Sequence, residues 1–265
     1  MNATGPPDRA APVCYVYGVV PAGTAEPRDV EGVGDPPSPV TLVRHRRIAA
    51  VVSEIDGGRP LGTPEDLLGH ARVLDSLAAA RTPVLPLRFG AVLSGVDAVA
   101  DGLLEPHEQR FLAALEDLSG LAQFTVRGTY RQDGVLREIL AERADIARLR
   151  EDVAGLPEDA GGNQRIQLGE LVSQELTARA QADTEHLMEA LGPLAAKASH
   201  SAATPDQPVH ASFLVADDRW KEFEHATEDL AAAWRGRIDV RLLGPLAPYD
   251  FASGIVDAPG QESWD

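Results

Sequence analysis

Apolar residues recur with two different periods along the chain, and these periods predict where strands and helices lie. Short stretches rich in Val, Ile, Phe and Tyr, several of them alternating with polar residues, predict strands. In chain order they are PVCYVYGVV, VTLVRH, RIAAVVSEI, VLPLRFGAVLS, FTVRGTY, VHASFLVA and RIDVRLLGPL. VTLVRH and RIAAVVSEI meet near Arg46 and therefore predict a hairpin.

Apolar residues at helical spacing predict helices between these strands. The first helix has a clear start, because Thr63 can cap it and Pro64 suits its first position. Its buried face is expected to hold Leu67, Leu68, Ala71, Leu74 and Ala78. Further helices are predicted within residues 96–118, 134–199 and 217–236.

The second half of the long helical region is amphipathic. One apolar stripe runs along it, formed by Leu168, Val172, Leu176, Ala180, Leu187, Leu191 and Leu194. Such a stripe is more often core than interface, but it can also cover apolar surface on another protein. Leu187 and Leu191 are therefore candidates for a partner contact.

Strands and helices alternate in both halves of the chain, which predicts an α+β fold with two domains. The boundary is expected near Gly120. Residues 13–119 would form an N-terminal α+β domain, and residues 120–251 a C-terminal domain with a helical extension. Pro, Gly and polar residues dominate residues 1–12 and 252–265, which predicts a disordered N-terminal tail and a C-terminal tail.

Composition and charge narrow the class of protein. With 265 residues, 44% of them hydrophobic and 25% charged, the chain has the make-up of a globular protein. Its net charge of -17 disfavours nucleic acid and anionic lipid as partners. Cys14 is the only cysteine, which excludes an intramolecular disulfide. No stretch has the length of a membrane span and the N-terminus lacks a secretory pattern, so we expect a cytoplasmic protein without membrane contact.

The sequence holds no motif of the familiar catalytic or metal-binding kinds. Its seven histidines show no metal-site spacing, and there is no nucleophile elbow, phosphate-binding loop or dinucleotide-binding turn. His107 and Glu108 lack a second histidine at helical spacing, so they do not form a zinc-protease motif. We therefore expect a binding or assembly protein without catalytic residues, metal or cofactor. An enzyme whose site is assembled from distant residues stays open as an alternative.

In the stretch VLPLRFGAVLS, Arg88 stands among apolar residues. Burying an unpaired guanidinium is costly, so Arg88 needs a partner, a solvent-facing position or a ligand. Pro86 favours an edge strand, which would end at Gly90. We expect Arg88 to bond neighbouring carboxylates or carbonyls, which gives Arg88, Pro86 and Gly90 structural roles. Contact with a partner is the main alternative for Arg88.

A second unusual stretch, GPLAPYDF, follows the last predicted strand. Its prolines favour an extended course, in which Tyr249 and Phe251 would be neighbours on one side. Such a segment can dock a partner, or it can latch one domain to the other. Tyr249 and Phe251 are thus candidates for a partner contact.

Several stretches in order resemble one known family, the gas vesicle accessory proteins GvpF/GvpL. They are CYVYGVVPA, IAAVVSEID, TPVLPLRFGAVLS, FTVRGTY and VRLLGPLAPYDF, and they are spread from Val13 to Phe251. The last resembles the terminal Gly-Pro-x-Pro-Pro-Tyr-x-Phe segment of that family, with Ala247 where proline is usual.

The resemblance implies an assembly protein, and not an enzyme, that supports formation of the gas vesicle. Its partners would be the small hydrophobic main shell protein and other accessory proteins, and its location the gas vesicle in the cytoplasm. The C-terminal domain would have a modified ferredoxin-like fold with inserted helices. The alternative in a different class is a ferredoxin-like regulatory module that binds a small metabolite.

Overall fold

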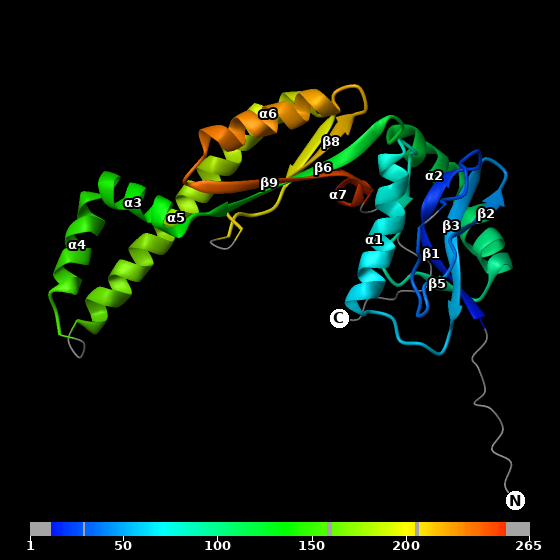
Figure 1. The fold of residues 1–265 in the computed structure, drawn as a ribbon, viewed down its shortest axis with the longest axis horizontal. Coiled ribbons are helices and arrows are strands. Elements are labelled where there is room, and N and C mark those ends of the chain that lie inside the picture. The colour runs from blue at the N-terminus through cyan, green and yellow to red at the C-terminus, as the bar shows by residue number, and fades with distance from the viewer. Residues whose placement is uncertain (1–11, 29, 158–160, 205–206, 253–265) are drawn as a thin grey trace, which may run out of the picture. The chain divides into compact units, whose positions relative to one another are not determined.

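The computed structural model describes residues 12–28, 30–157, 161–204 and 207–252. Within them the chain divides into two compact units (Figure 1). Unit 1 comprises the described residues up to Gln123 together with those from Gly244 onward. Unit 2 comprises the described residues from Phe124 to Leu243.

This division corrects one part of the predicted domain organisation. Residues 244–251 were assigned to the C-terminal domain because they follow its last strand, but they belong to unit 1. The predicted boundary near Gly120 lies close to the observed one after Gln123. The tails predicted at residues 1–12 and 252–265 lie outside the described residues, except for Pro12 and Ala252, which belong to a strand and a helix.

Unit 1 contains a five-stranded sheet, here sheet A, in which β2, β3, β1 and β4 are neighbours in that order and β5 also pairs with β1. All of its pairings are antiparallel. The strands are β1 (Pro12–Pro21), β2 (Thr41–His45), β3 (Ile48–Asp56), β4 (Leu85–Pro86) and β5 (Val92–Leu93). The predicted hairpin is present as β2 and β3. The strand predicted over residues 84–94 is instead the two short strands β4 and β5, because the chain turns between them at Gly90, where φ is +91°.

Helices cover both faces of sheet A. They are α1 (Pro64–Ala79), the π-helical segment η1 (Ala98–Leu104) and α2 (Glu105–Asp117). α1 packs on the face that carries Tyr15, Tyr17 and Val51. η1 and α2 contact the strands as well, and β3 is buried at successive positions, as a strand covered on both faces must be.

α1 starts as the sequence predicts, but its buried face is different. Thr63 Oγ1 accepts the Asp66 N–H and the Asp66 carboxylate accepts the Thr63 N–H, each at 3.2 Å, which forms a capping box. Arg59 pairs with Asp66 at 2.8 Å. The buried residues of α1 are Asp66, Gly69, His70, Val73, Leu74, Leu77 and Ala78. The prediction that Leu67 and Leu68 are buried is wrong: they are 50% and 61% exposed, because the capping box turns Asp66 toward the interior.

The Pro- and Gly-rich loop between β1 and β2 is held on sheet A by Tyr17. The Tyr17 hydroxyl accepts the Val33 N–H (2.7 Å) and donates to Ser53 Oγ (2.9 Å), which donates to the Pro39 carbonyl (2.8 Å). A Cβ at Gly32 would lie 2.3 Å from the Tyr17 oxygen, so glycine is required for this close approach. The loop is therefore fixed by hydrogen bonds near Val33 and near Pro39.

Unit 2 is built on a four-stranded sheet, here sheet B, in which β7, β8, β6 and β9 are neighbours in that order. The strands are β6 (Leu121–Tyr130), β7 (Lys197–His200), β8 (Val209–Ala216) and β9 (Ile238–Leu246). The chain passes from unit 1 to unit 2 within β6 and returns within β9. Two helices, α5 (Gly162–Leu191) and α6 (Trp220–Ala233), lie on one side of sheet B and enclose a core with Phe124, Phe213 and Phe223 at its centre (Figure 1).

A helical extension is inserted between β6 and β7. It consists of α3 (Gln132–Glu142), α4 (Ala144–Ala154), the N-terminal half of α5, and the short 3-10 turn η2 (Gly192–Leu194) that follows α5. Its own small core joins Val135, Ile139 and Ile146 to Leu168, Leu171, Val172 and Leu176. The apolar stripe of α5 therefore has two partners, with its first half against α3 and α4 and its second half in the core of sheet B.

Candidate functional site

The C-terminal segment, residues 244–252, is anchored in unit 1 at a buried alanine. Ala247 is completely buried, and its N–H donates to the Asp75 carboxylate of α1 at 3.0 Å. Burial raises the pKa of Asp75, while the Ala247 N–H opposes that rise. Sequence reasoning missed Asp75. The available signal was its place on α1 at i+4 from Ala71, on the flank of the helix that also carries Leu68.

The segment ends in the short helix α7 (Tyr249–Ala252), which is held by Gln123. The Asp250 N–H donates to Gln123 Oε1 (3.1 Å), and Gln123 Nε2 donates to Asp250 Oδ2 (2.8 Å). The prediction of an extended course is wrong at this point. Because helical residues two apart point in different directions, Tyr249 and Phe251 do not share one side as predicted.

Tyr249 contacts an aromatic cluster beneath it. Its ring lies 6.2 Å from that of His70, and the His70 ring lies 5.7 Å from Phe89 and 5.8 Å from both Tyr15 and Tyr17. Burial, with the nearby Asp75 carboxylate, raises the pKa of the Tyr249 hydroxyl, yet the residue as a whole keeps 36% of its surface exposed. Tyr249 therefore presents part of its ring on the surface of unit 1.

His70 lies at the centre of this cluster as a neutral side chain. Its Nδ1 is 2.8 Å from the Tyr15 hydroxyl, which also accepts the Gly90 N–H at 3.3 Å. Burial lowers the pKa of His70 to about 4, so the ring is uncharged near neutral pH. His70 thus joins α1 to β1 and, through Tyr15, to the chain at Gly90. The only sign of this role in the sequence is the place of a histidine on the apolar side of a helix.

The three candidate structural residues of the 84–94 stretch have different environments. Pro86 is buried in β4, at the end of the strand order of sheet A, where its missing N–H costs no ladder hydrogen bond toward a further strand. Gly90 adopts a positive φ that favours glycine. Arg88 is exposed and makes no ion pair or hydrogen bond with any described residue. The predicted pairing of Arg88 with a neighbouring carboxylate or carbonyl is therefore wrong, and the solvent-facing alternative describes it instead.

Leu187 and Leu191 do not form a surface. Both are completely buried and lie in the core between α5 and sheet B. Their proposed role as partner contacts is incompatible with this burial. An apolar stripe shows which face of a helix is covered, but it does not show which element covers that face. Here sheet B covers it.

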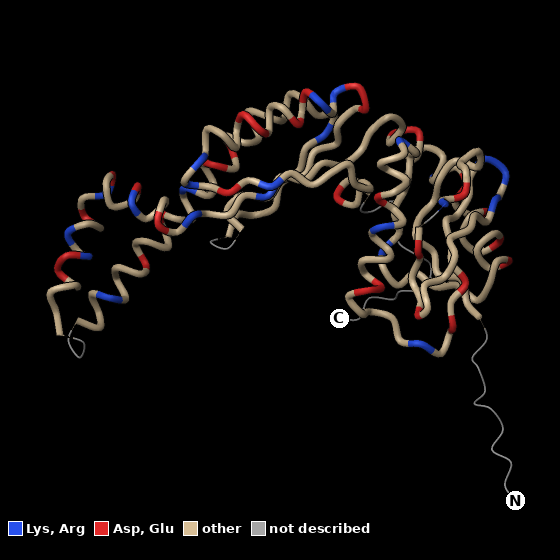
Figure 2. The backbone as a smooth tube through the Cα atoms, in the orientation of Figure 1, with Lys and Arg blue, Asp and Glu red and all other residues tan. Residues whose placement is uncertain are grey.

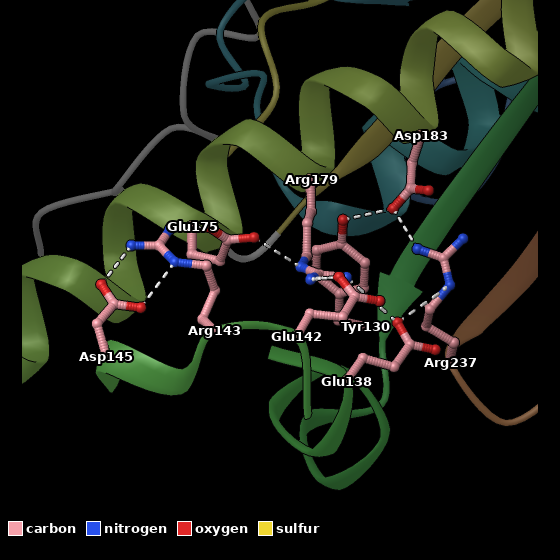
Figure 3. Close-up of polar contacts among 9 residues, drawn as sticks. All are labelled: Tyr130, Glu138, Glu142, Arg143, Asp145, Glu175, Arg179, Asp183 and Arg237. Carbon is pink, nitrogen blue, oxygen red and sulfur yellow. Dashed lines mark hydrogen bonds and ion pairs between the residues drawn. The ribbon is translucent and has the colours of Figure 1, made fainter. Parts of the chain in front are cut away.

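A network of ion pairs joins the helical extension to sheet B (Figure 3). At the sheet end, the Asp183 carboxylate of α5 accepts the Tyr130 hydroxyl at 2.6 Å and Arg237 Nη1 at 2.7 Å. Burial, followed by the hydrogen bond to Asp183, raises the pKa of Tyr130. Arg237 also approaches Glu138 of α3 at 3.7 Å, so β6, α3, α5 and the start of β9 meet here.

The network continues along α5 through two more arginines. Arg179 pairs with Glu138 (3.5 Å), Glu175 (3.2 Å) and Glu142. Glu175 also pairs at 2.6 Å with Arg143, the residue between α3 and α4. Arg143 in turn holds the pKa of the exposed Asp145 down to about 2. Glu175, Arg179 and Asp183 of α5 thus tie the extension to the start of β9 (Figure 3).

Unit 1 also has an open cleft of about 650 Å³ beside the end of β3. Prolines of the loop at residues 36–39 line it together with Asp35, Glu54, Asp56 and Arg59. Small-molecule sites are mostly apolar or aromatic with a few convergent polar groups, which this lining is not. Among the described residues, no group of three or more His, Cys, Asp or Glu side chains could hold a metal ion. In the same part of the chain, no helix combines the length and apolarity that crossing a bilayer requires.

Comparison with known proteins gives a family match that spans both units. The model of the family described as "Gas vesicle synthesis protein GvpL/GvpF" matches residues 13–253. The chain belongs to the GvpL/GvpF family. The match includes the C-terminal segment that docks in unit 1 as well as the whole of unit 2.

Relatives within the GvpL/GvpF family carry both names. Gas vesicle protein F of Streptomyces sp. (strain CB03234) is 31% identical over 242 residues, which are 89% of this chain and 98% of that protein. Gas vesicle protein L1 of Halobacterium salinarum is 27% identical over 260 residues, 91% of this chain and 90% of that protein. The crystal structure of GvpF from Anabaena sp. PCC7120 matches with a TM-score of 0.73 at 24% identity, covering 91% of this chain and 98% of that one. It shows that the fold is shared.

Proposed function

We propose that the chain is an accessory protein of gas vesicle formation that binds the main shell protein and other accessory proteins at the vesicle, in the cytoplasm. The observation that carries this proposal is the family match over residues 13–253, which spans both units. An assembly role also suits the cleft beside the end of β3, whose lining is not typical of a small-molecule site. Catalysis is not part of the proposal, and neither is a membrane or nucleic-acid partner.

We assign the shell contact to the α1–α7 surface of unit 1, defined by Leu67, Leu68 and Tyr249. These three side chains are among the large hydrophobic residues that stay exposed, at 50%, 61% and 36%. Leu68 and Asp75 lie on the same flank of α1, at i and i+7, with Leu67 about 80° away from Asp75 around the helix, and Asp75 anchors the C-terminal segment that carries Tyr249. Of the four residues predicted as contacts, Tyr249 is kept, Phe251 is a half-buried neighbour, and Leu187 and Leu191 are dropped.

Apolar contact is the expected basis of this binding. A hydrophobic shell protein exposes apolar surface before it polymerises, and covering that surface is favourable without specific geometry. With a net charge of -17, long-range attraction would help only toward a basic partner. Raising the salt concentration from about 0.1 M to about 1 M should therefore leave the binding intact, since it screens charge but not apolar contact.

The test is co-purification of the shell protein with full-length variants. We expect Leu67→Ser with Tyr249→Ala to reduce the recovered shell protein about tenfold or more, because each truncated apolar contact is worth about 1 kcal/mol or more. Ile166→Ser is the matched control, since Ile166 on α5 is 62% exposed and lies in unit 2. Melting curves should show all variants folded. Equal recovery with the double variant, or loss of binding in high salt, would place the contact elsewhere.

We further propose that unit 2 is a modified ferredoxin-like fold. The support is its connectivity: β6, a helical insertion, β7, β8, α6 and β9 follow one another, and β6 and β8 are the central strands of the order β7-β8-β6-β9. The helical extension between β6 and β7 is the modification. A high-resolution experimental structure of unit 2 with a different strand order would contradict this assignment.

A further inference from the structure

Sheet B has one face covered by helices and one face that is not. On β6, Phe124 and Val126 point into the helical core, so the alternate residues Thr125, Arg127 and Thr129 lie on the opposite face. Within unit 2, α5 and α6 both lie on the first side (Figure 1). The opposite face is here called the open face of sheet B.

The open face collects basic residues from three strands. On β9, Val240 and Leu242 pack against the core, which puts Arg241 on the open face with Arg127 of the neighbouring β6. On β7, Lys197 lies directly opposite Leu214 of β8 in the strand register. Leu214 follows the core residue Phe213 and so points to the open face, and Lys197 points there with it. All three cations are exposed.

These three cations lack carboxylate partners of the kind that Arg143, Arg179 and Arg237 have in unit 2. No described residue makes an ion pair or hydrogen bond with the side chain of Arg127, Arg241 or Lys197. The acidic residue Asp239 of β9 shares the face but is paired with Arg131 at 2.8 Å. Like charges on neighbouring strands destabilise a sheet, so an unneutralised basic face is unexpected in a chain of net charge -17.

The rest of the open face is mixed: by the same alternation it includes the polar residues Thr129 and His210 and two leucines, of which Leu214 is completely buried and Leu243 is 39% exposed. Thr125 and Ser212 are buried at one end of it, 3.1 Å apart, while Thr129 is exposed at the other. In Figure 2, basic and acidic positions both occur along the strands of unit 2 and along α6.

We propose that the open face of sheet B binds an acidic segment of a partner protein, with Arg127, Arg241 and Lys197 as its carboxylate-binding residues. This goes beyond the proposed function, which places the shell contact on unit 1. Two arginines on neighbouring strands can each donate two parallel hydrogen bonds to a carboxylate. At physiological salt the Debye length is about 8 Å, so a short segment responds to these cations more than to the net charge of the chain.

Charge and composition favour protein over nucleic acid as the partner. Binding single-stranded nucleic acid on a sheet face relies mainly on large aromatic side chains that stack with bases, and the described residues of this face include one histidine, His210, but no Phe, Tyr or Trp. A nucleic acid also carries dense charge over a long stretch and would meet the acidic remainder of the chain.

The test uses full-length protein and a labelled polyglutamate peptide of about ten residues, followed by fluorescence anisotropy at about 0.05 M and 0.15 M salt. We expect Arg127→Glu with Arg241→Glu to weaken binding about tenfold or more. The matched control is Arg148→Glu with Arg150→Glu on α4, which changes the net charge equally at two exposed arginines without ion pairs to described residues. The affinity of this control for polyglutamate should be within about twofold of that of the parent. The same is expected of the Leu67→Ser with Tyr249→Ala variant, because the proposed site on sheet B is separate from the shell contact.

Several outcomes would overturn the proposal. Failure of polyglutamate to bind the parent is one such outcome, and equal loss of binding by both charge-reversal variants is another, because it would reduce the effect to net charge. A single-stranded RNA of similar length that binds more tightly through Arg127 and Arg241 would make the face a nucleic-acid site. Self-association of the parent that these two arginines control, seen by sedimentation, would make the occupant a second copy of the chain.

Discussion

At the scale of single residues, His70 makes the stability of unit 1 depend on pH. Its pKa is lowered to about 4 in the folded protein by burial, against about 6.5 when exposed. A depressed histidine pKa means that the unfolded chain binds the proton first as pH falls. Stability is therefore complete above about pH 6.5 and decreases down to about pH 4, by about 3 kcal/mol in total.

The measurement is chemical unfolding of the parent and of His70→Gln between about pH 7 and pH 4. Carboxylates titrate in the same window, so the informative quantity is the difference in pH dependence between the two proteins. We expect His70→Gln to be less stable at pH 7, because the cluster with Tyr15 and Phe89 is disturbed, but to lose less stability on acidification. His225→Gln is the control, since His225 is well exposed, and it should keep the slope of the parent. If His70→Gln leaves the dependence of stability on pH unchanged, the buried His70 ring does not control that dependence.

At the scale of elements, the packing of α3, α4 and α5 against one another depends on Arg179, the arginine with the most ion pairs in the network. Arg179 is largely buried among Glu138, Glu142 and Glu175, so removing it leaves Glu142 without an ion pair to any described residue and Glu138 and Glu175 with one arginine each. Breaking an exposed ion pair costs under about 1 kcal/mol of stability, and removing one partner of a fully buried pair costs about 3–5 kcal/mol. The pairs of Arg179 are partly buried, so we expect a cost between these two values. We expect Arg179→Ala to destabilise unit 2 by about 2 kcal/mol.

Thermal unfolding followed by circular dichroism measures this effect. Arg148→Ala on α4 is the control and should change stability by less than about 0.5 kcal/mol, because Arg148 is exposed without an ion pair to any described residue. High salt should narrow the gap between Arg179→Ala and the parent, since screening weakens the attraction that the parent loses. Equal melting of the two variants would show that the network contributes no stability.

At the scale of the whole molecule, local patterns predict the elements well but not their partners. The strands, the hairpin and the start of α1 follow from periodicity and from capping residues such as Thr63. The docking of the C-terminal segment does not, because the contact of Ala247 with Asp75 joins residues 172 apart in the sequence. Arg88 looks buried from its neighbours alone, yet the turn at Gly90 breaks the strand and leaves it exposed. Which candidate contacts are accessible is thus decided by long-range packing.

The central claim, an accessory role in gas vesicle formation, is tested most directly by deleting the gene and counting vesicles by electron microscopy. We predict that deletion removes most vesicles. The parent gene and Ile166→Ser should restore them, whereas Leu67→Ser with Tyr249→Ala should not, although it accumulates as folded protein. Normal vesicle numbers in cells that lack the gene would contradict the account.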